Sequence, residues 1–600
     1  MKSKKIYLIY VLGIMIMFST FANAVEIMEL NEIRAGMEGY AKTVFNGYEI
    51  MEFPVEIINI LEDQGLNTDL ILFKASGDKI DEVGGIAAGM SGSPVFIDGK
   101  LIGAIGYGWS FSDHRYGLIT PIEDMLKLLD EPLKQDEEKD NLIRFNTPLY
   151  ISGMNGRSFS RMENKFENLG FEVLQGGGYS SVEEVPDSFE PGSAIAVQLV
   201  RGDINVASIG TLTYKENEKI LAFGHPFFNK GDVDYLLSRA NINGIIPSIE
   251  SPFKLGSATD ELIGSIHVDR RAGVAGQLNQ YPKIIPLTVK VNDIDRDKTN
   301  VVSVQMVKDE DLLTDLMTNV SLQSLDSTLD RIGSGTAHVN FKITGQGLPD
   351  MTVERSNVFY SRSDIAAVSL YEIYNIMDII TSNPFEEVNL IDIKLDIVVE
   401  DTDNVALIQE AKVLNEEIRP GDRLEVEITL RPYRSEPFVK TVFIDLPEDM
   451  NSGLATMVID GGLTGESYQA IPEEGTEEED NQAIIEGYKD LDSILEDYLN
   501  SAKNNELIVQ VYPGYPMAGI DQPAVNPGEA TQEVQDETGN QGDPSAEDYG
   551  MEEDMSLENQ DIREAYPTDY VLEGSLSIDL NVLEKDNSET IDEENDSQKE

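Results

Sequence analysis

Short strand-like runs separated by glycine-rich turns dominate residues 27–131. These runs are β-branched or alternate between apolar and polar side chains, a pattern typical of strands. They comprise residues 53–60, 70–74, 94–97 and 101–107. Asp98-Gly99 lies between the last two runs and predicts a two-residue hairpin turn. A short helix is expected over residues 121–129. The pattern predicts a mainly β protein.

A chain of 600 residues is too long for one hydrophobic core, so several domains are expected. Residues 27–131 form the first unit, and the charged stretch 131–140 is a linker candidate. A second β-rich unit covers residues 145–308, and a mixed, helix-containing region covers residues 309–384. Residues 385–462 are expected to form a β-sandwich, because apolar and polar side chains alternate strictly over residues 423–430.

The segment after residue 466 is rich in Glu, Asp, Gln and Pro, a composition typical of disorder. Residues 507–512 and 570–582 interrupt this acidic tail and are candidate strands. The whole chain has a net charge of −64, about half of it after residue 466. A nucleic-acid partner is not expected, because phosphate binding requires clustered Lys and Arg.

The N-terminus reads as a signal peptide over residues 1–24. Lys2, Lys4 and Lys5 precede an apolar run from Ile6 to Phe18, and Ala22-Asn23-Ala24 provides a cleavage site. We therefore expect a secreted or cell-envelope protein without a stable membrane span after cleavage. An uncleaved anchor is the alternative. The chain has no cysteine, which excludes disulfides and thiol chemistry.

The segment from Gly84 to Pro94 carries the strongest chemical signal. A serine hydroxyl attacks a carbonyl only beside a base and a pair of donors for the oxyanion. Ser91 stands between two glycines at positions 89 and 92, which allow a tight turn. The N–H groups of Gly89 and Ser91 are the candidate oxyanion donors. The alternative is an ordinary Gly-Ser turn between two strands.

Gly89-Met90-Ser91-Gly92-Ser93-Pro94 resembles the nucleophile signature of the SpoIVB sporulation peptidase family. The similarity extends over residues 27–130 and 190–290, and its further matches include Gly84-Gly85-Ile86, Gly210 to Thr213, Gly224-His225 and Ile263 to Ile266. The resemblance implies a chymotrypsin-like double β-barrel and a serine endopeptidase. The family places its histidine half first, whereas here Ser91 precedes His225. The chain therefore resembles a permuted, exported branch with its two halves in reversed order.

His225 is the candidate general base. The resemblance implies this role, and elimination among the four histidines of the chain agrees with it. His114 lies in a polar loop and is expected to be exposed. His267 and His338 fall in strand patterns and are interpreted as ordinary surface or core residues. His225 lies in a semi-apolar turn, where the surroundings can tune an imidazole.

The acid that orients the imidazole is not settled by the sequence. The register of the family places Ser76 where its acid stands, with Asp78 two residues and Asp81 five residues further on. Asp78 is the candidate we choose, and Asp269 is the alternative from its spacing after His225. A Ser–His dyad without an acid is also consistent with the sequence.

Substrate-binding residues are expected after the nucleophile. Residues 106–110 resemble the exposed strand that pairs with the substrate backbone in chymotrypsin-like enzymes, which makes Tyr107, Gly108 and Trp109 the candidates. A core or rim role for Trp109 is the alternative. Gly85 and Ile86 at the pocket floor favour an apolar substrate side chain.

The sequence thus predicts a secreted serine endopeptidase that forms an acyl-enzyme on Ser91, acts on a protein or peptide substrate and uses no metal or cofactor. The predicted β-sandwich is a candidate surface for a cell-wall or envelope partner. The alternative function is an inactive cell-envelope scaffold or protein-binding module with the same fold.

Overall fold

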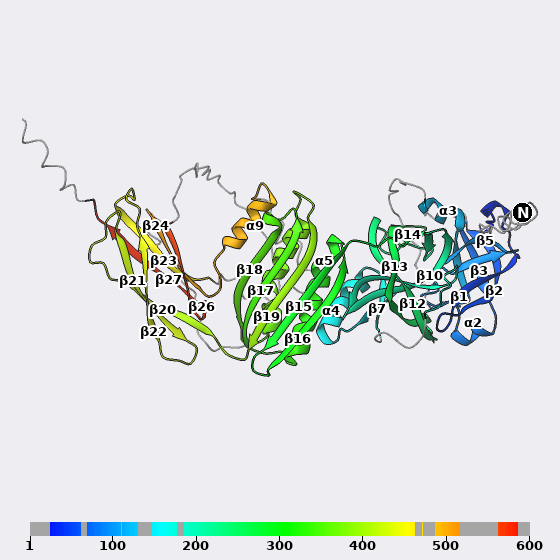
Figure 1. Cartoon of the computed structure of the whole chain (residues 1–600), viewed down its shortest axis with the longest axis horizontal. Coiled ribbons are helices and arrows are strands. Elements are labelled where there is room, and N and C mark those ends of the chain that lie inside the picture. The colour runs from blue at the N-terminus through cyan, green and yellow to red at the C-terminus, as the bar shows by residue number, and fades with distance from the viewer. Residues whose placement is uncertain are drawn as a thin grey trace, which may run out of the picture.

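The computed structural model describes residues 25–61, 69–109, 111–129, 147–176, 185–462, 471, 487–514 and 562–585. Strands make up 52% and helices 17% of the structure, which confirms a mainly β protein. The described part is elongated, with the N-terminal barrel at one end and a β-sandwich at the other (Figure 1). The predicted signal peptide, the linker at 131–140 and much of the acidic tail lie outside the described residues.

The N-terminal unit is a closed six-stranded barrel in the order β1-β2-β3-β6-β5-β4. Its strands are β1 (Glu38–Val44), β2 (Ile50–Leu61), β3 (Leu70–Ala75), β4 (Pro94–Ile97), β5 (Lys100–Tyr107) and β6 (Tyr116–Pro121). Its helices are η1 (Leu30–Glu32), α2 (Asp78–Val83), α3 (Ile122–Leu126) and η2 (Lys127–Leu129). Asp98 and Gly99 both have positive φ and join β4 to β5, as the hairpin signal predicts.

The second unit is also a closed ring of six strands, in the order β9-β12-β13-β14-β11-β10, because β9 pairs with β10 as well as with β12. Its strands are β9 (Ala194–Gly202), β10 (Asn205–Glu216), β11 (Lys219–Ala222), β12 (Gly231–Ile246), β13 (Phe253–Arg270) and β14 (Gly273–Leu278). The elements β7 (Thr147–Ser152), α4 (Gly156–Asn168) and β8 (Phe171–Gln175) extend the sheet from β10. Ser91 lies in the first barrel and His225 in the second, so the double barrel has its halves in the predicted order.

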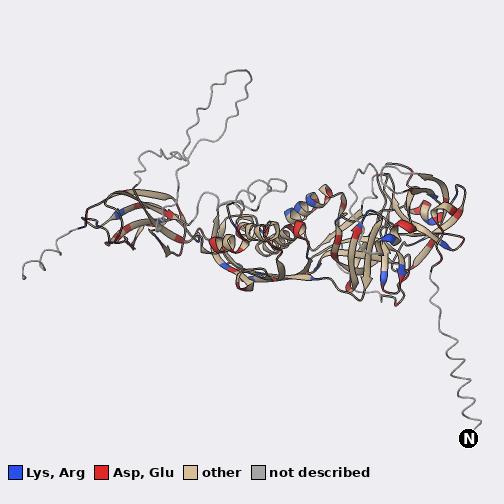
Figure 2. Ribbon diagram, turned by 90° about the horizontal axis from the view of Figure 1, so that it is seen from above, with Lys and Arg blue, Asp and Glu red and all other residues tan. Residues whose placement is uncertain are grey.

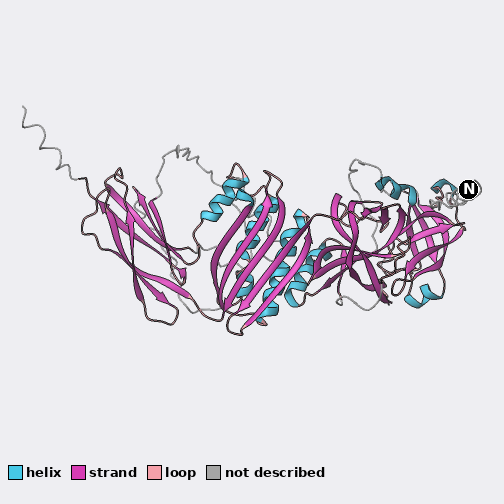
Figure 3. Cartoon of the chain, viewed as in Figure 1, coloured by secondary structure: helices cyan, strands magenta, loops and turns pink. Residues whose placement is uncertain are grey.

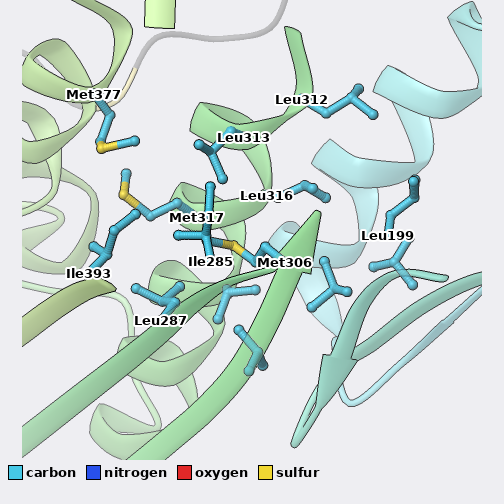
Figure 4. Close-up of a cluster of buried hydrophobic side chains, with 14 of the residues drawn as sticks. Leu199, Ile285, Leu287, Met306, Leu312, Leu313, Leu316, Met317, Met377 and Ile393 are labelled. Carbon is cyan, nitrogen blue, oxygen red and sulfur yellow. The ribbon is translucent and has the colours of Figure 1, made fainter. Parts of the chain in front are cut away.

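The third unit is a sheet with helices on one face (Figure 3). It contains β15 (Ile284–Asp293), β16 (Lys298–Val307), α5 (Glu310–Leu329), β17 (Gly335–Gln346), η3 (Pro349–Met351), β18 (Thr352–Ser361), α6 (Ile365–Val368), α7 (Tyr371–Ser382), β19 (Asn389–Glu400) and α9 (Leu491–Asn500). Side chains of α5 such as Leu313 and Met317 pack on Ile285 and Met306 of the sheet (Figure 4). The helix is buried on nearly all sides, and its buried residues include polar ones such as Thr318, Asn319 and Ser324 beside the leucines.

The boundaries of this unit differ from those that the sequence predicts. The sequence pattern places β15 and β16 in the histidine half and β19 in the sandwich. The structure instead pairs β19 in parallel with β15 and antiparallel with β17. Parallel pairing joins segments distant in sequence, and no local pattern reports it.

The C-terminal unit is a sandwich of two four-stranded sheets, ordered β22-β21-β20-β26 and β25-β24-β23-β27. Its strands are β20 (Val405–Val413), β21 (Arg423–Pro432), β22 (Phe438–Asp445), β23 (Gly453–Gly461), β24 (Glu506–Pro513), β25 (Ile562–Pro567), β26 (Val571–Glu573) and β27 (Ser575–Val582). Half of these strands come from the segment after residue 466. The two candidate strands of the tail therefore have counterparts in β24 and in β26 with β27, whereas β25 and α9 were not foreseen.

Acidic residues are spread along the whole described molecule, with basic residues among them (Figure 2). Within the described ranges, no helix is long and apolar enough to cross a membrane.

Candidate active site

The turn that carries Ser91 is shaped by the contact between the two barrels. Gly89 and Gly92 have φ of 88° and 91°, a conformation that side chains rarely adopt. A Cβ atom at Gly92 would collide with the carbonyl oxygen of Thr211 and lie 2.6 Å from the backbone nitrogen of Phe223. Both of these neighbours belong to the second barrel, so glycine at 92 is required by close packing as well as by the turn.

Ser91 is only 2% exposed. Its backbone carbonyl accepts a hydrogen bond of 2.8 Å from the N–H of Thr211. Its Oγ atom has no hydrogen-bond partner among the described residues. By contrast, the hydroxyl of Ser93 donates to the carbonyl of Met90 at 2.6 Å. A buried hydroxyl without a partner costs about 1–3 kcal/mol, and such strain is typical of a reactive group.

His225 lies three residues after the end of β11 and is fully buried. Its Nδ1 atom is 2.8 Å from the carbonyl oxygen of Pro226, which can only accept a hydrogen bond. Nδ1 therefore carries the proton of the neutral ring, and Nε2 is the basic nitrogen. The ring packs edge-on against Tyr107 and Phe223, with centroid distances of 6.2 and 5.8 Å.

The turns of Ser91 and His225 meet at the barrel interface. Gly92, next to the nucleophile, approaches Phe223, two residues before the histidine. A Cβ atom at Gly106 would collide with the carbonyl oxygen of Gly224. The structure therefore brings the two predicted residues to one interface, and the hydrogen bond between Oγ and the imidazole stays a prediction.

The predicted oxyanion donors are available. Among the described residues, the N–H groups of Met90, Gly92 and Ser93 donate to the carbonyls of Ala87, Ile105 and Met90. The N–H groups of Gly89 and Ser91 make no such bond in the described part of the chain. This pair of unused donors, two residues apart, has the composition of an oxyanion hole.

The candidate acids lie in different environments. Asp78 is exposed in the first turn of α2, where a carboxylate interacts favourably with the helix dipole, and His225 is buried. Asp269, the alternative, is fully buried in β13. Its carboxylate accepts the N–H groups of Phe227, Phe228 and Asn229 at 2.6, 2.6 and 2.8 Å. Burial raises the pKa of Asp269, and these N–H bonds oppose that effect. Asp269 thus holds the loop that follows His225.

The expectation of an exposed strand at residues 106–110 is wrong for its first part. Strand β5 pairs with β4 on one side and β6 on the other, and Tyr107 is 2% exposed. The Tyr107 hydroxyl donates to the carbonyl of Arg271 in the second barrel at 3.2 Å. Gly108 is buried, and Trp109 is half-buried against Tyr107 and Leu118. A substrate-binding role for Tyr107, Gly108 and Trp109 stays a prediction.

The other three histidines, His114, His267 and His338, lie in different environments. His114 is 8% exposed, contrary to the expectation of a solvated loop, because Nε2 lies 3.1 Å from the carbonyl of Ile249. His267 is half-buried in β13, and burial lowers its pKa. His338 is exposed on β17, 3.5 Å from Glu400. No group of metal-ligating side chains occurs in the described ranges.

Lys254 is a buried group at this interface that sequence reasoning missed. Its side chain is fully buried, and Nζ donates to the hydroxyls of Thr43 and Thr211 at 2.7 and 3.3 Å. Burial lowers the pKa of the Lys254 ammonium group to about 7. From the sequence, a lysine at the start of a strand is expected to be solvated. Lys254 is buried because the two barrels pack against each other at this position.

Residues 11–126 match the family model described as SpoIVB peptidase S55. The matched part contains Ser91 and Gly89 and ends before the second barrel, so it does not include His225. No curated protein and no solved structure matches the chain.

Proposed function

Because residues 11–126 match the SpoIVB peptidase S55 family model, we propose that the protein is an endopeptidase that hydrolyses peptide bonds through an acyl-enzyme on Ser91. The observation that carries this proposal is the buried Ser91 hydroxyl, which has no partner among the described residues and lies on a turn packed against that of His225. The unused N–H groups of Gly89 and Ser91 support it further.

The chemistry follows from these groups. His225 Nε2 accepts the proton of Ser91 Oγ while Oγ bonds to the substrate carbonyl carbon. The negative charge moves to the carbonyl oxygen, where the N–H groups of Gly89 and Ser91 stabilise it. The imidazolium then protonates the leaving amine as the C–N bond breaks. A water molecule, deprotonated by His225, hydrolyses the ester and restores Ser91.

The site as described is closed. Ser91 is 2% exposed and His225 is fully buried, so a substrate must displace neighbouring segments. The turn between β12 and β13 is the segment we propose to move. The carbonyl of Pro252 accepts the N–H of Ala88, and that of Glu250 accepts the N–H of Phe111. This turn therefore lies against both the nucleophile segment and the loop after β5.

Labelling with a fluorophosphonate probe tests the proposal. The purified protein should be labelled, and both Ser91→Ala and His225→Ala should abolish the labelling. Ser208→Ala is the matched control, because Ser208 is a buried serine whose hydroxyl donates to the carbonyl of Pro148. This control should be labelled like the wild type. Labelling that persists in Ser91→Ala would place the nucleophile elsewhere, and an unlabelled wild type would favour the inactive scaffold.

We also propose that the protein is exported by residues 1–24, a segment outside the described residues. The basic and apolar pattern of that segment supports export. N-terminal sequencing of the protein recovered from culture medium and envelope fractions should find a start near Val25. A start at Met1 in the membrane fraction would indicate an uncleaved anchor.

The sandwich is our proposed site for an envelope partner. Phe438, Val439 and Phe443 are 40%, 56% and 38% exposed on β22, a strand at the edge of its sheet. Exposed apolar side chains at a sheet edge support docking of a partner. Purified cell walls should retain the protein, and Val439→Lys should weaken that retention. Equal retention of both proteins would exclude this edge as the docking surface.

A further inference from the structure

Lys254 lies beneath the nucleophile turn and bridges the two barrels. Its Nζ reaches Thr43 on β1 of the first barrel and Thr211 on β10 of the second. Its stem lies against Gly89, because a Cβ atom built there would be 3.2–3.4 Å from three carbons of the lysine side chain. No other lysine in the described residues is fully buried.

Thr211 connects this amine to the turn. Its hydroxyl donates to the carbonyl of Gly89 at 3.2 Å, and its N–H donates to the carbonyl of Ser91 at 2.8 Å. A hydroxyl has one proton to donate, and Thr211 donates it to Gly89. The Thr211 oxygen therefore accepts the hydrogen bond from the Lys254 amine through a lone pair. The side chain of Lys254 therefore sets the rotamer from which Thr211 binds the turn.

The main chain of Lys254 contacts the same turn. Its N–H donates to the carbonyl of Ala88 at 2.9 Å. A peptide unit is planar, so this bond fixes the plane that also carries the N–H of Gly89. The next plane carries the carbonyl of Gly89, which Thr211 holds. Both planes on either side of Gly89 are thus fixed by Lys254, one directly and one through Thr211.

The charge state of Lys254 follows from its surroundings. No carboxylate forms an ion pair with it in the described part of the structure, and burial is the cause that lowers its pKa to about 7. The hydroxyl of Tyr150 donates to the backbone carbonyl of Lys254, and the half-buried Glu172 acts electrostatically on Tyr150. Above neutral pH the amine is uncharged and still has two N–H groups, one for each threonine.

We propose that Lys254 is a positioning residue for the reaction at Ser91: with Thr211 it fixes the orientation of Gly89, so that the Gly89 N–H faces the developing oxyanion. This role rests on the proposed peptidase function. In this role Lys254 neither donates nor accepts a proton during the reaction. Protonation below neutral pH places a charge in the buried interface, and we expect this charge to loosen the turn.

The test compares fluorophosphonate labelling rates between pH 5 and 10. Lys254→Met keeps the length of the side chain and the N–H bond to Ala88 but removes the amine. We expect its labelling rate to fall at least tenfold at pH 8. In the wild type, part of the rise of the labelling rate with pH should follow the loss of the Lys254 proton near pH 7, and Lys254→Met should lack this part of the profile. A residue with a merely structural role would not change the shape of this profile.

A second pair of variants keeps the proposal testable if Lys254→Met does not fold. Thr211→Val removes the linking hydroxyl at constant shape and should slow labelling, whereas Thr211→Ser keeps the hydroxyl and should restore it. Ser208→Ala on the same strand is the control and should behave like the wild type. If the wild type is labelled and neither Lys254→Met nor Thr211→Val changes the rate or the profile, the positioning role is refuted and the peptidase function stands.

Hydrogen exchange separates the two proposals. The amides of residues 88–92 and of Thr211 should exchange faster in Lys254→Met than in the wild type. An unlabelled wild type refutes the peptidase function, and the exchange rates then decide whether Lys254 holds the turn. Unchanged exchange of these amides overturns the inference in either case.

Discussion

The hydroxyl of Thr120 donates a hydrogen bond of 2.5 Å to the carbonyl of Gly224, the residue before His225. Thr120 belongs to the first barrel and Gly224 to the second. Because a peptide unit is planar, this bond also orients the N–H of His225. The histidine turn is therefore held by the barrel that carries the serine.

Thr120→Val tests this relationship, since it removes the hydroxyl at nearly constant volume. The Gly224 carbonyl would be buried without its partner, at a cost of about 1–3 kcal/mol. We expect a lower free energy of unfolding and slower fluorophosphonate labelling. Thr120→Ser keeps the hydroxyl and should be labelled at nearly the wild-type rate. Equal rates for the valine and serine variants would contradict the prediction.

The serines at 91 and 93 should respond in opposite ways to substitution by alanine. Ser91→Ala removes a buried hydroxyl that has no partner among the described residues, so the free energy of unfolding should rise by up to about 1 kcal/mol. Ser93→Ala breaks the hydrogen bond to the Met90 carbonyl and should lower the free energy of unfolding by about 1 kcal/mol. Urea unfolding followed by the fluorescence of Trp109, the single tryptophan of the chain, measures both. A lower free energy of unfolding in Ser91→Ala would indicate that the Ser91 hydroxyl has a hydrogen-bond partner.

Asp269→Asn should damage both stability and activity. The carboxylate accepts three backbone N–H groups, whereas an amide offers one oxygen and places its own N–H₂ group against donors. We expect a loss of about 1–3 kcal/mol and slower labelling, because the loop after His225 loses its support. Asp78→Asn is the matched control, and its exposed side chain predicts a small effect on both measurements. A large loss of labelling in Asp78→Asn alone would restore Asp78 as the catalytic acid.

Lys254 predicts a specific dependence of stability on pH. The pKa of its ammonium group is about 7 in the folded protein and takes its ordinary value of 10.5 when unfolded. Between these values unfolding takes up a proton, so the free energy of unfolding rises with pH by up to about 1.4 kcal/mol per pH unit. Below pH 7 the amine is protonated in both states, and the cost of burying it is complete.

Lys254→Met lacks this titration. The stability advantage of the variant over the wild type should be largest at pH 7 and below, and should shrink as the pH rises toward 10. Unfolding in urea at several pH values, again followed by the fluorescence of Trp109, gives the difference in the free energy of unfolding between the two proteins. Parallel curves for the two proteins would show that Lys254 is charged in the folded state.

Two truncations test the architecture of the sandwich. A chain that ends at residue 465 lacks β26 of the first sheet and β24, β25 and β27 of the second. It exposes β23, whose two neighbours are lost, and should aggregate. A chain that ends at residue 585 keeps every described strand and should stay soluble with full labelling. Solubility of the shorter chain would show that the sandwich is dispensable for folding.

Local signals explain which parts of this fold the sequence predicts. The Asp98-Gly99 turn and the alternation over residues 423–430 depend on neighbours in sequence, and both match the structure. The assignment of β15, β16 and β19 to one sheet depends on pairing between distant segments. The position of Lys254 depends on the packing of one barrel against the other. The sequence therefore identifies Ser91 and His225 as candidates on two adjoining barrels, and it misses Lys254, which the contact between the barrels buries.

The order of the two barrels has a consequence during the proposed export. The first barrel is a closed ring formed by residues 38–121, so it can fold on the far side of the membrane before His225 has crossed. At that stage its serine would have no base and would be inert. Reactivity would arise only when the second barrel docks on the first, so a chain in transit would be protected from its own catalytic group. Reversal of the halves thus provides a delay that requires no propeptide.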